Sequence, residues 1–395
     1  MNEKQDKPEG RYLIALLSAV LHKEIPPPLP PELDLERLYK LAAWHSVANM
    51  ACYALNRLEP LPPPEIMKHF REARNKGIAK EARQELEVEL ILSALEEKQI
   101  KCMPLKGYII KNLYPQPNMR LMADVDILVE EGQLEKAGEI MLSLGYTAEH
   151  TGGNHDVYYK RPVMNIELHR ALIAEDNSKL FAYFGNGWER TRPAAGSNFR
   201  YEMSNEDFYI YLLAHMAKHY RGCGTGIRSV MDVWVYNQHY KDQLDWNYTN
   251  TELEKAGLHD FAQSVKELSD QWFDGKVAKE INQEMSAFIL TNGTYGTTRN
   301  AAINRFIQGK KDHDSFTMAK VKYTLRILFP NRQHMTILFP ILHKLPFLLP
   351  VCWALRGIRT VMFRRDNIRL NLGNISYLTR SSVEDLKKIQ QSQLP

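Results

Sequence analysis

Two aspartates one residue apart are the clearest chemical signal in this sequence. Asp124 and Asp126 lie in the segment DVDILV, where acidic and aliphatic residues alternate with the two-residue period of a β-strand. Side chains at positions i and i+2 of a strand share one face about 7 Å apart, so two carboxylates there raise each other's pKa. A divalent cation relieves that repulsion, and Mg²⁺ prefers carboxylate and phosphate oxygens. Such pairs also occur on ordinary solvated strand faces, so the pair alone does not establish a metal site.

A third carboxylate strengthens the interpretation. Glu167 lies in NIELHR, which we predict to be a later strand. If this strand pairs with DVDILV, Glu167 reaches Asp124 and Asp126. Three carboxylates around two metal ions would organise the in-line displacement of a phosphoryl group. These three residues are therefore candidate metal ligands and catalytic residues, and a solvated strand face stays the alternative.

A lysine and a glycine precede the aspartates at a predicted junction between strand and helix. In the segment PLKG, Gly107 would let a phosphate approach the N-terminus of the next helix, where free N–H groups attract anions. Lys106 would add a positive charge. The alternative is an ordinary turn glycine beside an exposed lysine, and the segment alone does not decide between them.

The elements that position these residues can be predicted from hydrophobic periodicity. Before residue 100, helical periods occupy 11–23, 35–58 and 64–100, separated by proline clusters. The period then changes, and we predict strands at 101–107, 124–129, 155–160 and 163–170, with helices at 107–114 and 130–146. Further helices are predicted at 205–220, with Ser204 as N-cap, and at 227–240, 249–273 and 275–290.

We therefore expect a helix-rich α+β fold with a small mixed β-sheet core flanked by N- and C-terminal helical regions. The predicted parts are an N-terminal helical region (1–99), a catalytic core (100–172) and a helical domain that closes the cleft (173–300). The remaining residues, 301–395, are predicted to be a basic, hydrophobic region packed on the rest.

The order of these motifs resembles the polymerase-β-like nucleotidyltransferase superfamily, and within it the bacterial family of uncharacterised nucleotidyltransferases. The resemblance covers residues 100–235 and rests on several short motifs. These are Leu105-Lys106-Gly107, Leu113-Tyr114-Pro115, Arg120, the DVDILV segment, Glu167-Leu168-His169-Arg170, the His215, Lys218 and His219 cluster, Arg228 and Asp232. Two departures stand out: Lys106-Gly107 replaces the Gly-Ser usual in the superfamily, and Arg170 replaces a usual tryptophan.

The resemblance implies transfer of a nucleoside monophosphate from an NTP, with ATP expected, to an acceptor hydroxyl. It implies Mg²⁺ or Mn²⁺ at Asp124, Asp126 and Glu167. The implied nucleotide-binding residues are Lys106, Gly107, Arg120, His169, His219 and Arg228. For Arg120 the alternative is an ion pair with the acids of the DVDILV strand itself. For the histidines the alternatives are buried hydrogen-bonded roles or, with less support, a zinc site. The acceptor, whether small molecule, protein or RNA, is not identified by the resemblance.

Composition limits the other classes. Hydrophobic residues make up 44% and charged residues 25% of the chain, which excludes a disordered or collagen-like protein. Four widely spaced cysteines and an N-terminus without an apolar segment predict a reduced, cytoplasmic protein. The most apolar stretch, 336–355, contains His343, Lys344 and three prolines, so we predict no transmembrane span.

Charge is concentrated at one end of the chain. Residues 301–395 contain 16 Lys and Arg but 5 Asp and Glu. A basic region indicates an anionic partner, a lipid surface or contact with the acidic remainder of the chain. The basic region leaves open a protein that contacts a membrane surface through 336–365, which we rank last. The family resemblance leaves open a second alternative, a catalytically silent regulatory or binding protein with the same fold.

Overall fold

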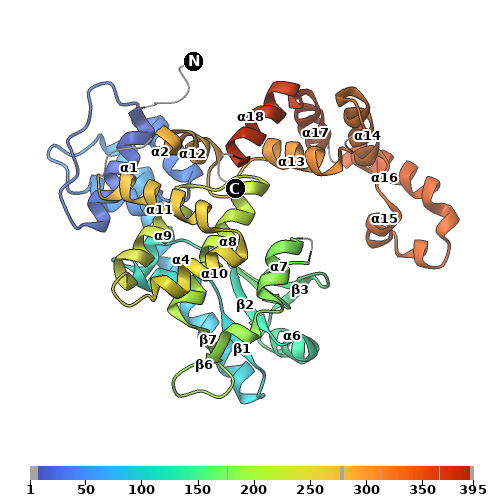
Figure 1. Cartoon of the computed structure of the whole chain (residues 1–395), viewed down its shortest axis with the longest axis horizontal. Helices are drawn as coiled ribbons and strands as arrows, with labels where there is room; N and C mark the ends of the chain where they lie inside the picture. Colours follow the sequence, from blue (N-terminus) through green and yellow to red (C-terminus); the bar gives the residue numbers. More distant parts are fainter. Residues whose placement is uncertain (1–7, 176, 276–279, 312, 364, 392–395) are drawn as a thin grey trace. The chain divides into compact units, whose positions relative to one another are not determined.

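The computed structural model describes residues 8–175, 177–275, 280–311, 313–363 and 365–391 (Figure 1). These residues form two compact units. The first contains the described residues up to 294 except 219–224, and the second contains 219–224 with the described residues from 295 onward. The helix-rich α+β fold expected from the sequence is confirmed.

Four helices open the first unit: α1 (Pro8–Leu21), α2 (Leu35–Trp44), α3 (Ala48–Leu55) and α4 (Pro64–Glu97). The prediction of one helix over 35–58 is wrong, because the chain turns at Ser46, whose φ is 54°. The turn places the fully buried His45 between distant segments. The Ile227 N–H donates to its Nδ1 at 3.2 Å, and its Nε2 lies 3.2 Å from the Leu290 carbonyl oxygen. These long-range contacts override the local helical period.

A five-stranded mixed sheet follows. Its strands are β1 (Cys102–Pro104), β2 (Val125–Val129), β3 (Thr147–His150), β4 (His155–Lys160) and β5 (Met164–His169), in the order β1-β2-β5-β4-β3. Strands β2 and β5 are parallel, and the other neighbours are antiparallel. Strand β3 was not predicted, because its residues TAEH are all exposed and show no apolar alternation.

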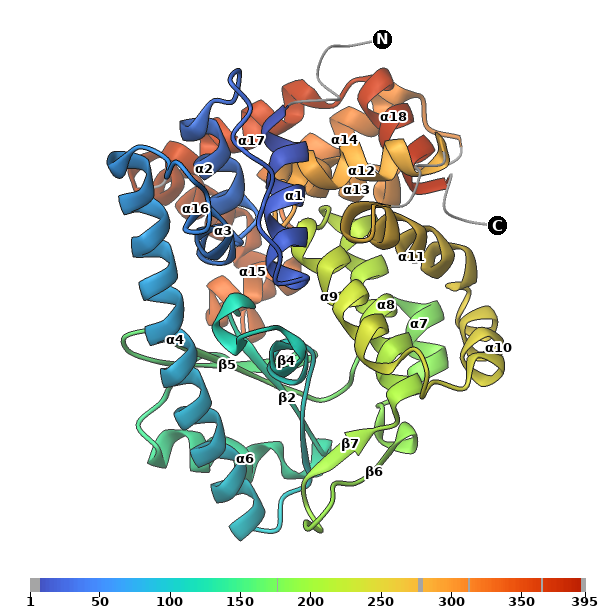
Figure 2. The same cartoon turned by 90° about the vertical axis from the view of Figure 1, so that its left-hand side faces the viewer.

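Alternation along the central strands gives the sheet one apolar and one polar face. Val125, Ile127 and Val129 of β2 point into a buried core, together with Ile166 and Leu168 of β5. Apolar side chains of α4 and α6 (Leu134–Ser143) complete this core, and Figure 2 shows the two helices beside each other. The strand residues that alternate with these apolar ones, such as Asp126 and Glu167, therefore lie on the opposite face of the sheet.

The first unit contains further helices and a second, smaller sheet. They are α5 (Gly107–Ile110), α7 (Ser178–Phe184), α8 (Asn205–Gly222), α9 (Ile227–Tyr240), α10 (Trp246–Ala256), α11 (His259–Phe273) and α12 (Glu280–Asn292), with a small antiparallel sheet of β6 (Thr191–Pro193) and β7 (Tyr201–Met203). Short 3₁₀ helices occupy Lys111–Leu113, Pro117–Met119, Glu131–Gln133, Trp188–Arg190, Pro340–His343 and Pro346–Leu348. Ser204 caps α8 as predicted, since its Oγ accepts from the Asp207 N–H at 3.0 Å.

The second unit is helical in its described residues after 295. Its helices are α13 (Thr298–Gly309), α14 (Phe316–Leu328), α15 (Arg332–Leu338), α16 (Leu349–Phe363), α17 (Arg365–Tyr377) and α18 (Arg380–Gln391). Around α15 and α16 it has a small core of Met335, Leu342 and Cys352. The packing of 301–395 on the rest of the chain stays a prediction.

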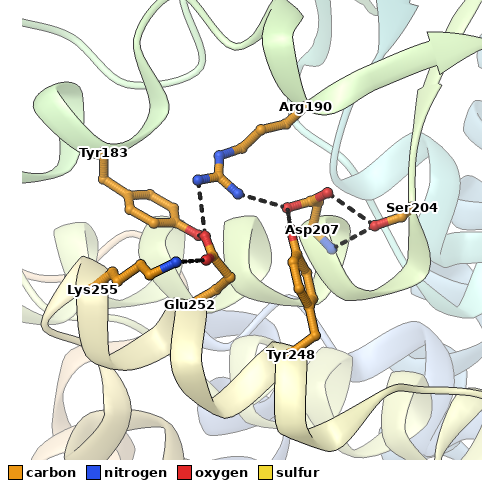
Figure 3. A network of polar contacts seen from close by, with 7 residues as sticks. All are labelled: Tyr183, Arg190, Ser204, Asp207, Tyr248, Glu252 and Lys255. Atoms are coloured by element: carbon orange, nitrogen blue, oxygen red, sulfur yellow. Dashed lines mark hydrogen bonds and ion pairs between the residues drawn. The ribbon is translucent and has the colours of Figure 1, made fainter.

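A polar network joins the segment after the sheet to helices α8 and α10 (Figure 3). Arg190 donates to Asp207 at 2.9 Å and to Glu252 at 3.0 Å, while its guanidinium lies 4.1 Å from the centre of the Tyr183 ring. The Tyr183 hydroxyl donates to Glu252 at 2.8 Å. Ser204, Tyr248 and Lys255 supply the remaining contacts. One guanidinium therefore neutralises two nearly buried carboxylates.

This network predicts a pH-dependent stability. Burial alone would raise the pKa of Glu252, but hydrogen bonds from Lys255, Tyr183 and Arg190 lower it to about 2. A carboxyl group with a lowered pKa stabilises the fold above its unfolded pKa of about 4.5 and loses that contribution as the pH falls toward 2. We expect Glu252→Gln to cost about 1–2 kcal/mol at neutral pH. Urea unfolding measured across this pH range should show a flatter acid limb for the variant, and equal limbs would contradict the assignment.

Candidate functional site

Pairing of the central strands brings the predicted carboxylates together on the polar face of the sheet. Asp126 lies opposite Glu167 in the parallel register of β2 and β5, which confirms the predicted pairing of these strands. His169 lies two residues after Glu167 and shares its face. The antiparallel register of β4 and β5 places His155 opposite His169. Four ligand-type side chains thus come from three adjacent strands.

These side chains lie within contact distance of one another. His169 Nε2 is 2.7 Å from Asp126 Oδ1 and 3.3 Å from Glu167 Oε2, and His155 Nε2 is 3.6 Å from the same Glu167 oxygen. One ligand atom from each of His155, Glu167 and His169 lies within 4.8 Å of the others. Asn154 Nδ2 lies 3.5 Å from the second ring nitrogen of His169. The ligand atoms of His155, Glu167 and His169 are therefore close enough together to share one metal ion.

Lys106 faces this cluster from the loop between β1 and α5. Its ammonium lies 3.2 Å from Asp126 Oδ1, and its side chain is 14% exposed. Its backbone has φ 44° and ψ −109°, a combination that non-glycine residues rarely adopt. Such strain persists only where the surrounding structure imposes it, and it concentrates at functional sites. The lysine thus stands at the site, but with a carboxylate partner in place of a phosphate.

Electrostatics distinguish the two aspartates. Burial would raise the pKa of Asp126, but Lys106 and the hydrogen bond from His169 hold it well below its usual range. Asp124, which directly precedes β2, has a raised pKa because it is partly buried and because Asp126 and Glu167 are negative. Lys106 only partly offsets this repulsion. At Asp124 the negative charges of its neighbours therefore outweigh the positive charge of Lys106.

The pKa values of His155 and His169 are shifted in opposite directions. Burial lowers the pKa of His155 despite the nearby Glu167, which favours a neutral imidazole. Burial would also lower the pKa of His169, but its bonds to Asp126 and Glu167 raise it. Neutral imidazole and ionised carboxylate are the forms that bind metals. The donor set fits a divalent cation at this cluster, where His155, Glu167 and His169 bring ligand atoms within reach of one ion. Asp124, Asp126 and Glu167 as its ligands stay a prediction.

Arg120 is engaged within the protein. Its Nε and second guanidinium nitrogen donate to the two Asp232 carboxylate oxygens at 3.2 and 2.8 Å, and the Tyr114 hydroxyl donates to the same carboxylate at 2.7 Å. Arg120 and Asp232 are 10% and 4% exposed. This contact, which we call the Arg120–Asp232 clasp, joins the segment before β2 to α9. An ion pair with the acids of β2 was the alternative considered from the sequence; the structure instead pairs Arg120 with Asp232, an acid on a distant helix.

Gly107 leaves the space that the Arg120 side chain occupies. A side-chain Cβ at Gly107 would collide with the Arg120 guanidinium and come within 2.9 Å of the Met122 sulfur. The glycine therefore gives Arg120 room to reach Asp232. Its predicted part in phosphate binding stays a prediction.

The remaining predicted residues are spread over more elements. Arg228, at the start of α9, donates to the Leu121 carbonyl oxygen at 2.6 Å, close to the entrance of β2. His219 lies in the part of α8 that belongs to the second unit, so its predicted contact with the nucleotide stays a prediction.

Several residues near the carboxylates were missed or given little weight by sequence reasoning. Tyr211 of α8 is fully buried beside Lys106 and Asp126, while Lys80 of α4 interacts electrostatically with Asp124. His215 and Lys218 of α8 influence the pKa values of Asp126 and His155. His155 was considered from the sequence as a possible site residue, with a hydrogen-bonded strand-end histidine as the preferred alternative; the β4–β5 register puts it on the face of Glu167. Tyr211 and Lys80 lie in ordinary helical patterns that carry no such signal.

Comparison with known proteins gives one match over much of the chain. The sequence model of the family described as "Uncharacterised nucleotidyltransferase" matches residues 31–274, which include every predicted site residue. No curated protein matches the chain. Among solved structures, the solution structure of the antibiotic-resistance factor ANT(2'')-Ia is similar at 12% identity and a TM-score of 0.33, over 47% of this chain and 93% of that chain.

Proposed function

The chain belongs to the family of uncharacterised nucleotidyltransferases, and from this premise we propose that it is a cytoplasmic, metal-dependent enzyme. We propose that it transfers a nucleoside monophosphate from an NTP, with ATP expected, to an acceptor hydroxyl. The observation that carries the proposal is the convergence of Asp126, Glu167 and His169 on one face of the sheet, with Asp124 close enough to feel their charge.

In this proposal Asp124, Asp126 and Glu167 hold Mg²⁺ or Mn²⁺. The metal would neutralise the triphosphate and lower the pKa of the attacking hydroxyl. Mn²⁺ accepts imidazole more readily than Mg²⁺, so the nearby His155 favours testing both ions. The His169 imidazole orients Asp126 and Glu167 through its two short contacts.

The reaction breaks the bond from the α-phosphorus to the bridging oxygen of pyrophosphate and forms a bond from that phosphorus to the acceptor oxygen. The acceptor hydroxyl loses its proton, and Glu167 is the proposed base. Its contact with His169 lowers the pKa of Glu167, so the carboxylate is ionised at neutral pH and can accept a proton. Lys106 and Arg228 are proposed to stabilise the triphosphate by their charge.

The alternative is a nucleotide-binding protein without turnover. One observation favours it: Asp126 Oδ1 already contacts both Lys106 and His169, so a metal ion must compete with two internal partners. Binding and turnover therefore need separate measurements.

The direct test measures nucleotide binding and turnover separately. Titration calorimetry of the four NTPs, each with Mg²⁺ and with Mn²⁺, measures binding. Release of pyrophosphate and transfer of α-³²P label to fractionated small molecules, protein and RNA measure turnover and identify the acceptor class. Binding without label transfer to any fraction would favour the silent alternative, and absence of metal-dependent binding would contradict both.

Lys106 provides a prediction within this framework. We expect Lys106→Met to weaken affinity for the Mg-bound NTP by about tenfold, because it removes one positive charge from a partly buried site. The remaining affinity should depend less on salt concentration. Lys101→Met is a matched control, since Lys101 contacts Glu130 at 40% exposure away from the cluster. Equal affinities for Lys106→Met and the parent would place Lys106 outside nucleotide binding.

A further inference from the structure

Helix α16 in the second unit exposes a continuous apolar stripe. Val351, Leu355, Ile358 and Met362 recur at spacings of four, three and four residues, so they share one helical face, and each is between 51% and 61% exposed. The opposite face is the packed one: Cys352 is buried, and the Trp353 indole donates to the Pro330 carbonyl oxygen at 2.9 Å. The helix thus presents its apolar side outward.

A neighbouring helix repeats this arrangement. On α14, Met318, Val321, Leu325 and Leu328 recur at spacings of three, four and three residues and are 48–55% exposed. The Arg356 guanidinium of α16 lies 3.4 and 3.5 Å from the last carbonyl oxygens of α14, which fixes the two helices beside each other. Phe347 and Phe363, 73% and 75% exposed, flank the α16 stripe at its two ends. We call these ten residues the apolar surface.

The charge around the apolar surface has one sign. Residues 316–380 contain 11 Lys and Arg but one acidic residue, Asp366. Arg359, Arg365 and Arg369 are exposed on α16 and α17. Soluble monomers rarely expose large apolar areas, and where they do, the area marks an interaction site. Apolar helical faces with basic flanks are typical of helices that lie in the interface of an anionic bilayer.

We propose that the apolar surface docks on an anionic lipid bilayer, with α14 and α16 lying in the interface and the exposed Arg359, Arg365 and Arg369 contacting lipid phosphates. This site is separate from the proposed nucleotide site and does not depend on it.

A membrane-spanning arrangement fits the same helix less well. Residues Pro346–Phe363 are long and apolar enough to cross a bilayer by length and composition alone. However, Arg356 and Arg359 lie inside this window, and charged side chains in the bilayer core are costly unless they face a protein interior. At the interface Arg359 reaches the phosphates and Arg356 keeps its contact with α14, while Leu355 and Ile358 enter the acyl region.

A second copy of this chain and the first unit are two other possible partners of the apolar surface, and both fit it less well. In a symmetric dimer of this surface, two strongly basic faces would meet and repel each other. The first unit is net acidic, but its described exposed large hydrophobic residues are scattered: Ile25, Trp44, Leu61, Ile78, Leu86, Leu90, Leu142, Val163 and Tyr248. They offer no apolar face comparable to the stripe of α16.

The test is vesicle flotation of the full chain. We expect at least about tenfold tighter binding to vesicles containing phosphatidylglycerol than to pure phosphatidylcholine, and release by high salt or alkaline carbonate. The variant Leu355→Glu with Ile358→Glu should lose at least about tenfold in vesicle affinity, because it places two charges in the stripe. Both residues are more than half exposed, so circular dichroism and thermal unfolding should match the parent.

A matched control makes the same change elsewhere. Leu86→Glu with Leu90→Glu alters two residues of α4 that are 66% and 57% exposed, and should leave flotation unchanged. Equal binding to both lipid compositions, resistance to carbonate, or flotation of the α16 variant like the parent would each overturn the proposal. Absence of flotation would overturn it as well. In that case light scattering that shows a dimer broken by the α16 variant would identify a second copy as the occupant.

Discussion

Replacement of Asp124 by asparagine should reduce nucleotidyl transfer by at least about 10³-fold and, in the metal-free protein, slightly increase stability. The loss follows from the proposed role of Asp124 as a metal ligand, since a bound metal ion contributes several kcal/mol of transition-state stabilisation. The gain follows from the raised pKa of Asp124, which shows that its negative charge is unfavourable beside Asp126 and Glu167. A residue that is needed for activity but opposed by its own surroundings is typical of a metal site.

The stability effect has a definite dependence on pH. A carboxyl group with a raised pKa favours the folded state in its protonated form, so its favourable contribution is present below its unfolded pKa and is lost as the pH rises through the folded value. The metal-free parent should therefore lose stability over this range more than Asp124→Asn does. Added Mg²⁺ or Mn²⁺ should reverse the order, because only the parent keeps the full ligand set.

Asp124 is a sharper choice than Asp126. Asp126 contacts Lys106 and His169, so its replacement leaves a partly buried ammonium unpaired and mixes structural with catalytic effects. Asp242→Asn, on an exposed residue after α9, is the matched control. The measurements are calorimetry with the metal-bound NTP, label transfer, and thermal unfolding with and without metal. If Asp124→Asn binds and transfers like the parent, the assignment of the site is wrong.

The carboxylate cluster could be predicted because its geometry is local to two strands. The period of DVDILV and NIELHR fixes which side chains share a face, and only the pairing of the strands had to be assumed. Asp126 and Glu167 indeed lie opposite each other. The position of His155 beside His169 depends on the register of the hairpin between β4 and β5, which hydrophobic periodicity does not supply.

Partners far apart in sequence could not be predicted in the same way. Arg120 and Asp232 were both recognised as parts of a motif, but 112 residues separate them, and no local pattern states that they meet. The turn at Ser46 could not be predicted for the same reason. It accompanies contacts of His45 with Ile227 and Leu290, which are far away in the sequence. Such pairings are decided by how helices pack on the sheet, which local propensity does not determine.

Loss of Asp232 should have the largest effect on stability among the changes considered. Asp232→Asn leaves the Arg120 guanidinium buried with one neutral partner, and removing one member of a buried ion pair typically costs 3–5 kcal/mol, or roughly 10 °C in Tm for a domain of this size. The Tyr114 hydroxyl also loses a charged acceptor. Because the clasp holds the segment leading into β2, label transfer should fall as well.

A second variant separates the charge from the packing. Arg120→Met with Asp232→Leu removes both charges at similar volume and should recover most of the lost stability, since apolar replacement of a buried ion pair is often neutral or better. Asp156→Asn is the matched control: its partner Arg170 is 24% exposed, so water can solvate the arginine and the cost should be smaller.

These variants also decide what Arg120 does. If Asp232→Asn is strongly destabilised and the double variant is stable but still binds the metal-bound NTP, Arg120 acts through the clasp and positions the segment before β2. If the double variant is stable and loses nucleotide affinity while keeping the fold, Arg120 leaves Asp232 to contact the triphosphate, as the sequence predicted. Asp232→Asn with the stability of the parent would contradict the clasp, because a buried guanidinium cannot lose its charged partner without cost unless it already has another.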